Sequence, residues 1–151
     1  MKKQMHKWRP RKRVWIFATL GAMALLLLYP FKTTVVPEWS VRIVDEAGNP
    51  LRTNRVREVW QHYTIESASH QEVLITDGEG YVTFPRRTVR GSLLVRIGWP
   101  IVNALSVHAS YGPSAGVYVL DHPTDSFLED NNSYFPGQPL PKQVVLKSAP
   151  H

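Results

Sequence analysis

The chain contains no cysteine among its 151 residues. This excludes disulfide scaffolds, thiolate zinc sites, cysteine nucleophiles and a bacterial lipid anchor on an N-terminal cysteine. The chain also has one long stretch without charged side chains, the 16 residues from 14 to 29. The remaining composition, with 43% hydrophobic residues, 12 prolines and 9 glycines, is ordinary for a turn-rich β domain and unlike that of a disordered chain.

The positive charge is concentrated at the N-terminus. The formal net charge of +6 comes from 18 lysines and arginines against 12 acidic residues. Residues 1–13 hold seven of these cations and no acid, so residues 14–151 hold 11 cations and 12 acids, a net charge of −1. Nucleic-acid binding needs basic groups on the folded surface, and we therefore expect no nucleic-acid partner.

The basic tail and the apolar run together predict a membrane anchor. We expect residues 1–13 to be a cytosolic basic tail and residues 14–31 a transmembrane signal-anchor helix. The uncharged run spans roughly 24 Å as a helix, slightly less than a hydrocarbon core of about 30 Å. The positive-inside rule then gives a single-pass protein of the cell membrane with a cytosolic N-terminus. Its C-terminal domain is expected to be extracytoplasmic, or periplasmic in a Gram-negative host.

Two alternatives to an uncleaved anchor are a cleaved signal peptide and a buried core helix. A signal peptide has the same basic and apolar regions but needs small residues after the apolar run. The run ends instead in Leu28, Tyr29, Pro30 and Phe31. A core helix would have no use for the seven-cation tail, which matches a topology signal. The uncleaved anchor is therefore favoured.

The rest of the chain reads as one β domain. Residues 32–38 are expected to be a linker, and residues 39–148 a β-sandwich with a long proline-rich loop at 121–142. Beyond the linker the hydrophobic period becomes two, which is typical of half-buried strands. The expected strands, separated by turn signals, are residues 39–43, 55–65, 72–76, 81–84, 92–99, 105–109, 117–120 and 143–147. This pattern predicts an all-β, antiparallel sandwich.

Three details of this strand pattern can be compared with a structure. Residues 55–65 also place apolar side chains at helical spacing, but their β-branched and aromatic content favours a strand with a bulge. Residues 77–80 read Asp-Gly-Glu-Gly, which predicts a hairpin between the strands at 72–76 and 81–84. Pro100 is expected to end the strand at 92–99, because proline cannot donate to a ladder.

Two motifs carry a family resemblance. Residues 41–51 read VRIVDEAGNPL, and residues 76–84 read TDGEGYVTF. Glycine and proline shape the first turn, and the side chain of Asp77 is suited to accept hydrogen bonds from backbone N–H groups in the second. Over residues 39–98 the chain resembles the carboxypeptidase regulatory-like domain, a transthyretin-like (prealbumin-like) sandwich of seven or eight strands. The resemblance implies an accessory, adhesive or ligand-holding module, and it carries no catalytic residues to transfer.

The candidate binding residues are two aromatic and two basic side chains. Tyr134 and Phe135 lie in the proline-rich loop, where they either form a contact surface or pack onto the sandwich. Arg86 and Arg87 follow the strand at 81–84, where they either bind an acidic partner or protect a sheet edge from pairing.

No catalytic or metal-binding constellation is recognisable. His62 and His70 lie near Glu66 and Glu72, but as residues of a strand or loop they are expected to be surface histidines. The acidic cluster that begins at Asp121 lacks the calcium-loop pattern, and no nucleophile-elbow motif supports a serine hydrolase. We therefore expect no catalytic residue, no metal and no cofactor.

The expected function is a non-enzymatic interaction or envelope-associated module. Its partners would be the membrane, through residues 14–31, and a protein or a glycan. A small-ligand or carbohydrate-binding domain using loop 121–142 is the alternative. A metal-assisted hydrolase using His62, His70 or the acidic cluster is the third possibility.

Overall fold

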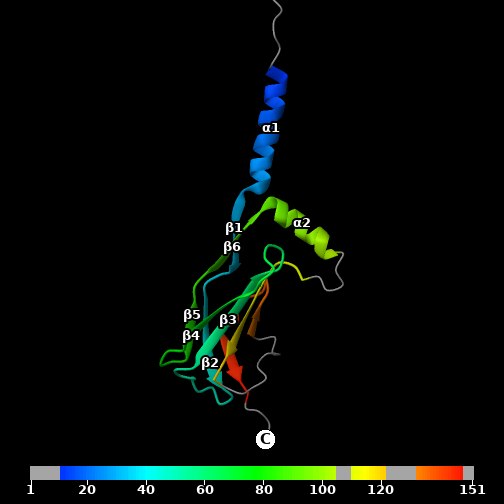
Figure 1. The fold of residues 1–151 in the computed structure, drawn as a ribbon. Coiled ribbons are helices and arrows are strands. Elements are labelled where there is room, and N and C mark those ends of the chain that lie inside the picture. Colours follow the sequence, from blue (N-terminus) through cyan, green and yellow to red (C-terminus); the bar gives the residue numbers. More distant parts are fainter. Residues whose placement is uncertain (1–10, 105–109, 122–131, 148–151) are drawn as a thin grey trace, which may run out of the picture.

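The computed structural model describes residues 11–104, 110–121 and 132–147, which form two helices and nine strands (Figure 1). Strands dominate, so the expectation of a mainly β fold is confirmed. In chain order the elements are α1 (Arg11–Leu28), β1 (Pro30–Val36), β2 (Trp39–Asp45), β3 (Arg55–His62), β4 (His70–Ile75), β5 (Tyr81–Phe84), β6 (Arg87–Ser92), α2 (Leu93–Ala104), β7 (Pro113–Val119), β8 (Ser133–Tyr134) and β9 (Gln143–Leu146).

Two sheets pack face to face and enclose the core. One sheet has the strand order β5-β2-β9 and the other has the order β4-β3-β7-β8. The buried core draws residues from both sheets and from the end of β1, among them Trp39, Phe84 and Val117. Among the strands of the described residues, all pairs but one are antiparallel. The exception is β2 with β9, which run parallel.

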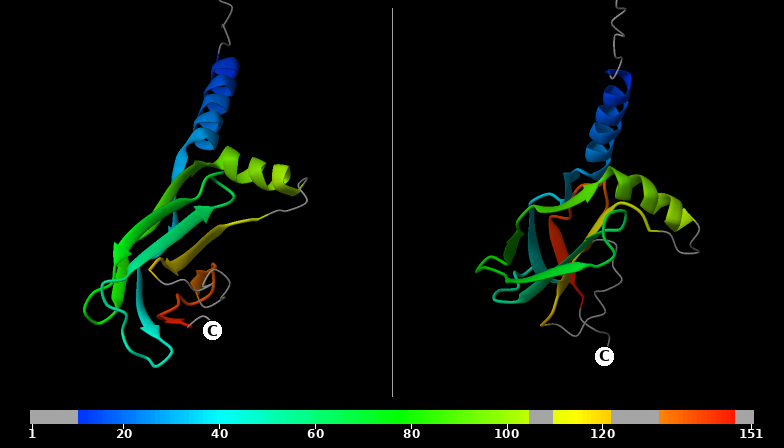
Figure 2. Two further views of the ribbon diagram at one scale, coloured as in Figure 1. Left: turned by 60° about the horizontal axis from the view of Figure 1, so that its bottom comes forward. Right: turned by 45° about the horizontal axis from the view of Figure 1, so that its top comes forward.

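The helices lie at one end of the molecule, on a two-stranded ribbon. β1 pairs with β6 in that ribbon, which extends from the sandwich towards both helices (Figure 1). α1 continues away from the sandwich, and α2 turns off across the direction of α1 in each view (Figures 1 and 2). The molecule therefore has a sandwich end and a helical end, joined by the ribbon.

Alternating burial explains the strand of the first motif. In β2 the side chains of Trp39, Val41 and Ile43 are fully buried, as the period of two predicts. The indole Nε1 of Trp39 donates a hydrogen bond to the backbone oxygen of Pro141, at 2.7 Å. This bond satisfies the one polar atom of the largest core side chain.

The two motif turns pack against each other. Asp77 Oδ1 accepts hydrogen bonds from the backbone N of Glu79 and of Tyr81, at 2.8 and 2.9 Å. These bonds, that from Tyr81 first, lower the pKa of Asp77. Gly80 has a φ of +81°, and a Cβ there would lie 2.7 Å from the backbone oxygen of Ile43. Only glycine suits both the backbone conformation and this close approach.

The predicted hairpin between the strands at 72–76 and 81–84 is wrong. β4 pairs with β3, whereas β5 pairs with β2 in the other sheet. The turn at residues 77–80 therefore crosses from one sheet to the other. Glycine-rich turn chemistry is common to hairpins and to such crossings, so the local sequence alone did not distinguish them.

Residues 32–36, expected within a linker, belong to strand β1. Val35 and Val36 are buried in the core. The chain thus passes from α1 into the sheet structure without a free segment.

The strand expected at 92–99 is also wrong, because α2 begins at Leu93. β6 ends at Ser92, whose register partner Pro30 is the first residue of β1. Beyond Ser92 no residue of β1 remains to pair with, and a helix satisfies the backbone groups internally. Ser92 Oγ accepts a hydrogen bond from the N of Val95, at 3.3 Å, as an N-cap does. Pro100 lies inside the helix.

Four other predicted strands, at 39–43, 55–65, 117–120 and 143–147, correspond to β2, β3, β7 and β9. β3 is shorter than predicted, because it ends at His62, and its register with β4 and β7 runs without the predicted bulge. Residues 105–109 lie outside the described part of the chain.

Candidate functional site

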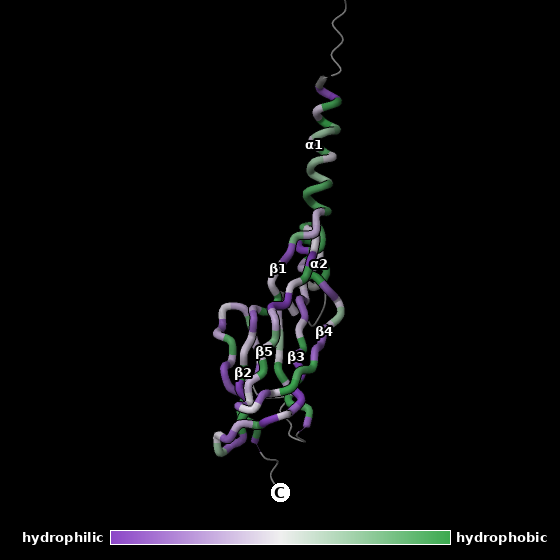
Figure 3. Tube along the Cα trace, turned by 90° about the vertical axis from the view of Figure 1, so that its left-hand side faces the viewer, coloured by the Kyte–Doolittle hydropathy of each residue, from purple (hydrophilic) through white to green (hydrophobic). Residues whose placement is uncertain are grey.

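The helical end carries an unusual apolar surface. Along α1, the side chains of Trp15, Phe17 and Leu25 are more than two-thirds exposed. Figure 3 shows α1 as hydrophobic along most of its length, with hydrophilic residues at its start. Monomeric soluble proteins rarely expose a contiguous apolar surface of this kind. Within the described residues, no helix is both long enough and apolar enough to cross a membrane.

A buried ion cluster lies between β3, β4 and β6. Glu58 is completely buried. Its Oε2 accepts a hydrogen bond from Arg87 Nε at 2.8 Å and forms an ion pair with Arg87 Nη2 at 2.7 Å. Arg87 also pairs with Glu72, the register partner of Glu58. One guanidinium thus bridges two carboxylates that face each other across neighbouring strands. Burial raises the pKa of Glu58, and the hydrogen bond from Arg87 opposes that shift.

Aromatic rings extend this cluster towards the surface. The guanidinium carbon of Arg87 lies 4.1 Å from the ring centroid of Trp60, which is cation–π geometry. His70 also stacks on that indole, with ring centroids 5.6 Å apart and an interplanar angle of 21°. His70 Nε2 is 2.8 Å from Glu66 Oε2. The cluster is therefore a structural network in which Arg87 pairs with Glu58 and Glu72, and His70 is hydrogen-bonded to Glu66.

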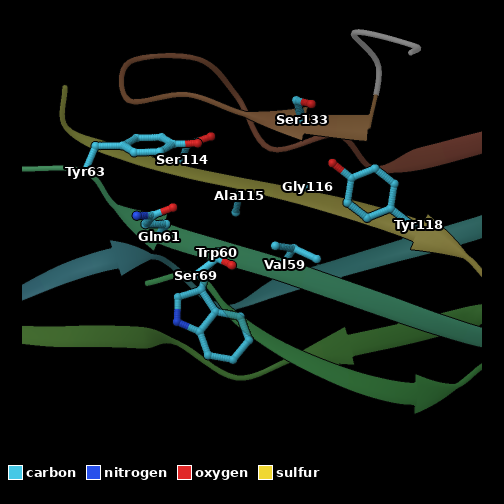
Figure 4. Close-up of a pocket in the computed structure, with 10 residues that line it drawn as sticks. All are labelled: Val59, Trp60, Gln61, Tyr63, Ser69, Ser114, Ala115, Gly116, Tyr118 and Ser133. Carbon is cyan, nitrogen blue, oxygen red and sulfur yellow. The ribbon is translucent and has the colours of Figure 1, made fainter. Parts of the chain in front are cut away.

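The outer face of the four-stranded sheet has a small groove of 110 Å³. Tyr63 and Tyr118 lie towards its two ends, with Gly116 of β7 between them (Figure 4). A Cβ on Gly116 would lie 2.7 Å from the hydroxyl oxygen of Tyr118, so a larger residue there would require the ring of Tyr118 to move. The polar lining residues Gln61 and Ser133 offer hydrogen bonds, a combination suited to a small polar ligand.

The structure separates the members of each predicted pair of binding residues. Tyr134, in β8, is half-buried and packs against the core, whereas the side chain of Phe135 is 49% exposed. Arg86 is exposed, whereas Arg87 is turned into the ion cluster. Phe135 and Arg86 are thus the accessible members. Residues 122–131 of the predicted binding loop lie outside the described residues, so a glycan-binding role of that loop stays a prediction.

The two histidines also separate. His70 is exposed, but His62 is 7% exposed and buried in β3, contrary to the expected pair of surface histidines. Burial lowers the pKa of His62, and the charge of Arg96 lowers it further. Within the described residues no group of three or more histidine, aspartate or glutamate side chains is placed to hold a metal ion.

Asp121, the first residue of the acidic cluster, has a structural role. Its carboxylate accepts hydrogen bonds from the backbone N of Arg55 at 2.6 Å and from the guanidinium at 2.7 and 2.9 Å. It therefore fixes the start of β3. The other members of the cluster, from 122 to 130, lie outside the described residues.

Sequence reasoning missed Glu58, the buried centre of the ion cluster. A signal was present, because Glu58 lies between Val56 and Trp60 on the inward face that the period of two predicts. An acid at an inward position requires a buried cation. Arg87, which was singled out only as a surface cation, is that partner.

Comparisons with protein-family models, with curated proteins and with solved structures give no match to this chain.

Proposed function

We propose that the protein is a membrane-anchored extracytoplasmic β-sandwich that acts as a non-enzymatic interaction or envelope-associated module. The single observation that carries the proposal is the exposed apolar surface of α1, which directly follows the seven-cation tail. Apolar side chains exposed all around a helix gain free energy from an apolar medium, at about 25 cal/mol per Å² transferred. A bilayer supplies that medium.

The charge pattern supports one orientation. Arg11, Lys12 and Arg13 occupy the first turn of α1, and cations flanking an apolar segment stay on the cytosolic side. The uncharged part of α1, residues 14–28, spans about 23 Å. Local thinning of the bilayer, or a contribution from Tyr29, Pro30 and Phe31, would be needed to match a hydrocarbon core of about 30 Å. The rings of Tyr29 and Phe31 contact each other edge to face, with centroids 4.9 Å apart, and tyrosine favours the interface.

The sandwich supports a role in interaction. Its ionisable clusters on the described residues are internally paired, as in the Glu58–Arg87–Glu72 network. The accessible Arg86 and Phe135 remain the binding residues of the proposal, with a protein or a glycan as partner. The motifs at 41–51 and 76–84 support a transthyretin-like, carboxypeptidase regulatory-like arrangement, whose role is accessory.

A topology experiment tests the anchor. The full chain is fused after His151 to a reporter enzyme that is active only outside the cytosol, and membranes are extracted with alkaline carbonate. We expect an active reporter that stays in the membrane pellet. Exchanging the seven leading lysines and arginines for glutamine should leave membrane association but mix the orientations, since the topology signal is lost. Release of the unaltered chain by carbonate, or an unchanged reporter in the glutamine variant, would contradict the proposal.

A further inference from the structure

α2 presents an apolar face to the outside. Ile97 and Ile101 are 58% and 63% exposed, and Leu94, Val95 and Val102 are exposed as well. The side chains of Leu93, Arg96 and Trp99, by contrast, are half-buried. A helix on the surface of a soluble domain normally turns its polar face to water. α2 instead turns its apolar face outward.

The only ionisable side chain of α2 is turned inward. Arg96 Nη2 donates a hydrogen bond to the backbone oxygen of Phe31 at 3.1 Å and also contacts Thr33 Oγ1. Arg96 Nε donates to the oxygen of Gly91 at 3.2 Å. The charge is thus used to fasten the helix to β1 and β6, and the exposed face is left without one.

The strand register places α2 at the end of α1. Pro30, two residues after α1, pairs with Ser92, which immediately precedes α2. The two helices contact each other there. From this point α2 runs across the direction of α1 (Figures 1 and 2). A bilayer that held α1 along its normal would therefore meet α2 at its surface, lying along that surface for about 18 Å.

Two cations lie just below this level. Lys32 and Arg90 are register partners on the ribbon, and both are exposed. Like charges directly opposite each other on a sheet are destabilising, unless an anion lies beside them. They are two residues from the Pro30–Ser92 pair, or roughly 7 Å along the strands. Anionic lipid headgroups would be at that depth.

We propose that α2 is an interfacial helix, whose apolar face is inserted in the outer leaflet of the bilayer that holds α1. The proposal rests on the proposed anchor, since α1 brings α2 to the membrane. It adds that the sandwich is attached at two places, α1 and α2. Such an attachment fixes the orientation of the sandwich relative to the membrane. Helices of this kind are buried about 5–10 Å into the boundary between headgroups and acyl chains.

Depth-dependent fluorescence quenching tests the proposal on the full chain. Because the chain lacks cysteine, single cysteines can be introduced at Ile101 in α2, at Leu20 in α1 and at Val73 in β4, which are all exposed. Each variant is labelled with an environment-sensitive dye and reconstituted in vesicles of phosphatidylcholine and phosphatidylglycerol. Lipid-attached quenchers report contact with the bilayer, and iodide reports contact with water.

We expect the dye at Leu20 and at Ile101 to show blue-shifted emission and loss of fluorescence with the lipid-attached quencher. The dye at Val73, an exposed apolar position on the sandwich, should be quenched by iodide alone. Leu94→Cys, on the same face of α2, repeats the measurement if Ile101→Cys does not keep the β-sheet circular dichroism spectrum. Vesicles of phosphatidylcholine alone should give weaker lipid quenching at Ile101, because they leave Lys32 and Arg90 without anionic partners.

The outcomes separate the two proposals. Lipid quenching at Leu20 together with iodide quenching at Ile101 would overturn the interfacial position of α2 and leave the anchor intact. Iodide quenching at both positions would overturn the anchor and, with it, the inference. Protection of Ile101 from both quenchers, with disulfide formation between two copies through unlabelled Ile101→Cys, would show that a second copy covers α2 and would also overturn it.

Discussion

The sandwich end and the helical end use the same apolar residue types in opposite ways. Trp39 and Ile43 of the sandwich are 0% exposed, whereas Trp15 of α1 is 70% exposed and Ile101 of α2 is 63% exposed. The sandwich completes its burial within the chain. The apolar side chains of the helical end are not covered by the chain itself, and this difference between the two ends is what supports the proposed membrane anchor.

The ribbon between the two ends contains both buried and exposed side chains. In β1, Val35 and Val36 belong to the core, while Lys32 and Thr34 face outward. Gly91 of β6 is packed so closely that a Cβ there would lie 2.5 Å from Ile65 Cγ2. The ribbon is thus packed closely against the segment that follows β3.

Exchanging a tryptophan at each end gives the largest expected difference. Trp39→Ala should lower the free energy of unfolding by about 3–5 kcal/mol, because it leaves a cavity in the core and removes the hydrogen bond to Pro141. Trp15→Ala is the matched exchange at an exposed position. It should leave the unfolding free energy nearly unchanged and weaken membrane association instead. Urea unfolding in detergent, followed by circular dichroism, measures the first effect, and vesicle flotation measures the second.

A destabilisation of the sandwich by Trp15→Ala as large as that by Trp39→Ala would break the comparison. It would mean that α1 packs against the protein in solution and that its exposure does not describe the functional state.

Two arginines of β6, one half-buried in the ion cluster and one exposed, allow the same comparison of covered and exposed side chains, with a smaller expected change in unfolding free energy. Arg87→Ala leaves Glu58 buried without a cation and should cost roughly 3 kcal/mol of unfolding free energy. Arg90→Ala, in the same strand but at an exposed position, should change it by less than about 0.5 kcal/mol. The double exchange Glu58→Leu with Arg87→Leu should recover most of the loss, because an apolar pair has no desolvation cost. Denaturant unfolding of these three variants and of the unaltered protein measures these differences.

Equal losses for Arg87→Ala and Arg90→Ala would mean that the ion cluster contributes no more than a surface cation does. A double exchange as unstable as Arg87→Ala would show that the site depends on charge and not on filling space.

The sequence predicted the sandwich end better than the helical end, for a physical reason. In β2 the side chains of Trp39, Val41 and Ile43 are buried and those between them are not, and the hydrophobic period of two reflects this directly. The pairing of the strands could not be predicted in the same way, because packing across the whole core determines which strand lies beside which. The turn at residues 77–80 therefore suggested a hairpin, although β4 and β5 belong to different sheets.

At residues 93–102 the apolar side chains fit a strand and a helix equally well. These residues form a helix because β1, far away in the sequence, begins at Pro30 and leaves no strand partner for residues beyond Ser92. The candidate site shows a similar limit. Arg86 and Arg87 are neighbours with the same side chain, but only a structure shows that Arg87 meets Glu58, 29 positions away in the sequence.

His62 provides the smallest of the expected effects, at the junction of the two ends. It is buried in β3, and burial, together with the charge of Arg96 in α2, lowers its pKa from the ordinary value of 6.5. Below pH 6.5 the unfolded chain takes up a proton that the folded chain resists. The contribution of neutral His62 to stability is therefore complete above pH 6.5 and is lost as the pH falls through the lower, folded-state pKa. The slope from this one group cannot exceed about 1.4 kcal/mol per pH unit.

His62→Gln should remove that slope. Unfolding free energies of the two proteins are compared at each pH from 7.5 to 5, so that the contribution of Glu58, whose pKa burial raises, cancels in the difference. Glu58 acts with the opposite sign, because a raised carboxyl pKa favours the folded state as the pH falls. A difference that stays constant across this range would mean that His62 accepts its proton as freely in the folded protein as in the unfolded chain. Neither the burial of His62 nor the charge of Arg96 would then oppose the uptake of a proton by this side chain in the folded protein.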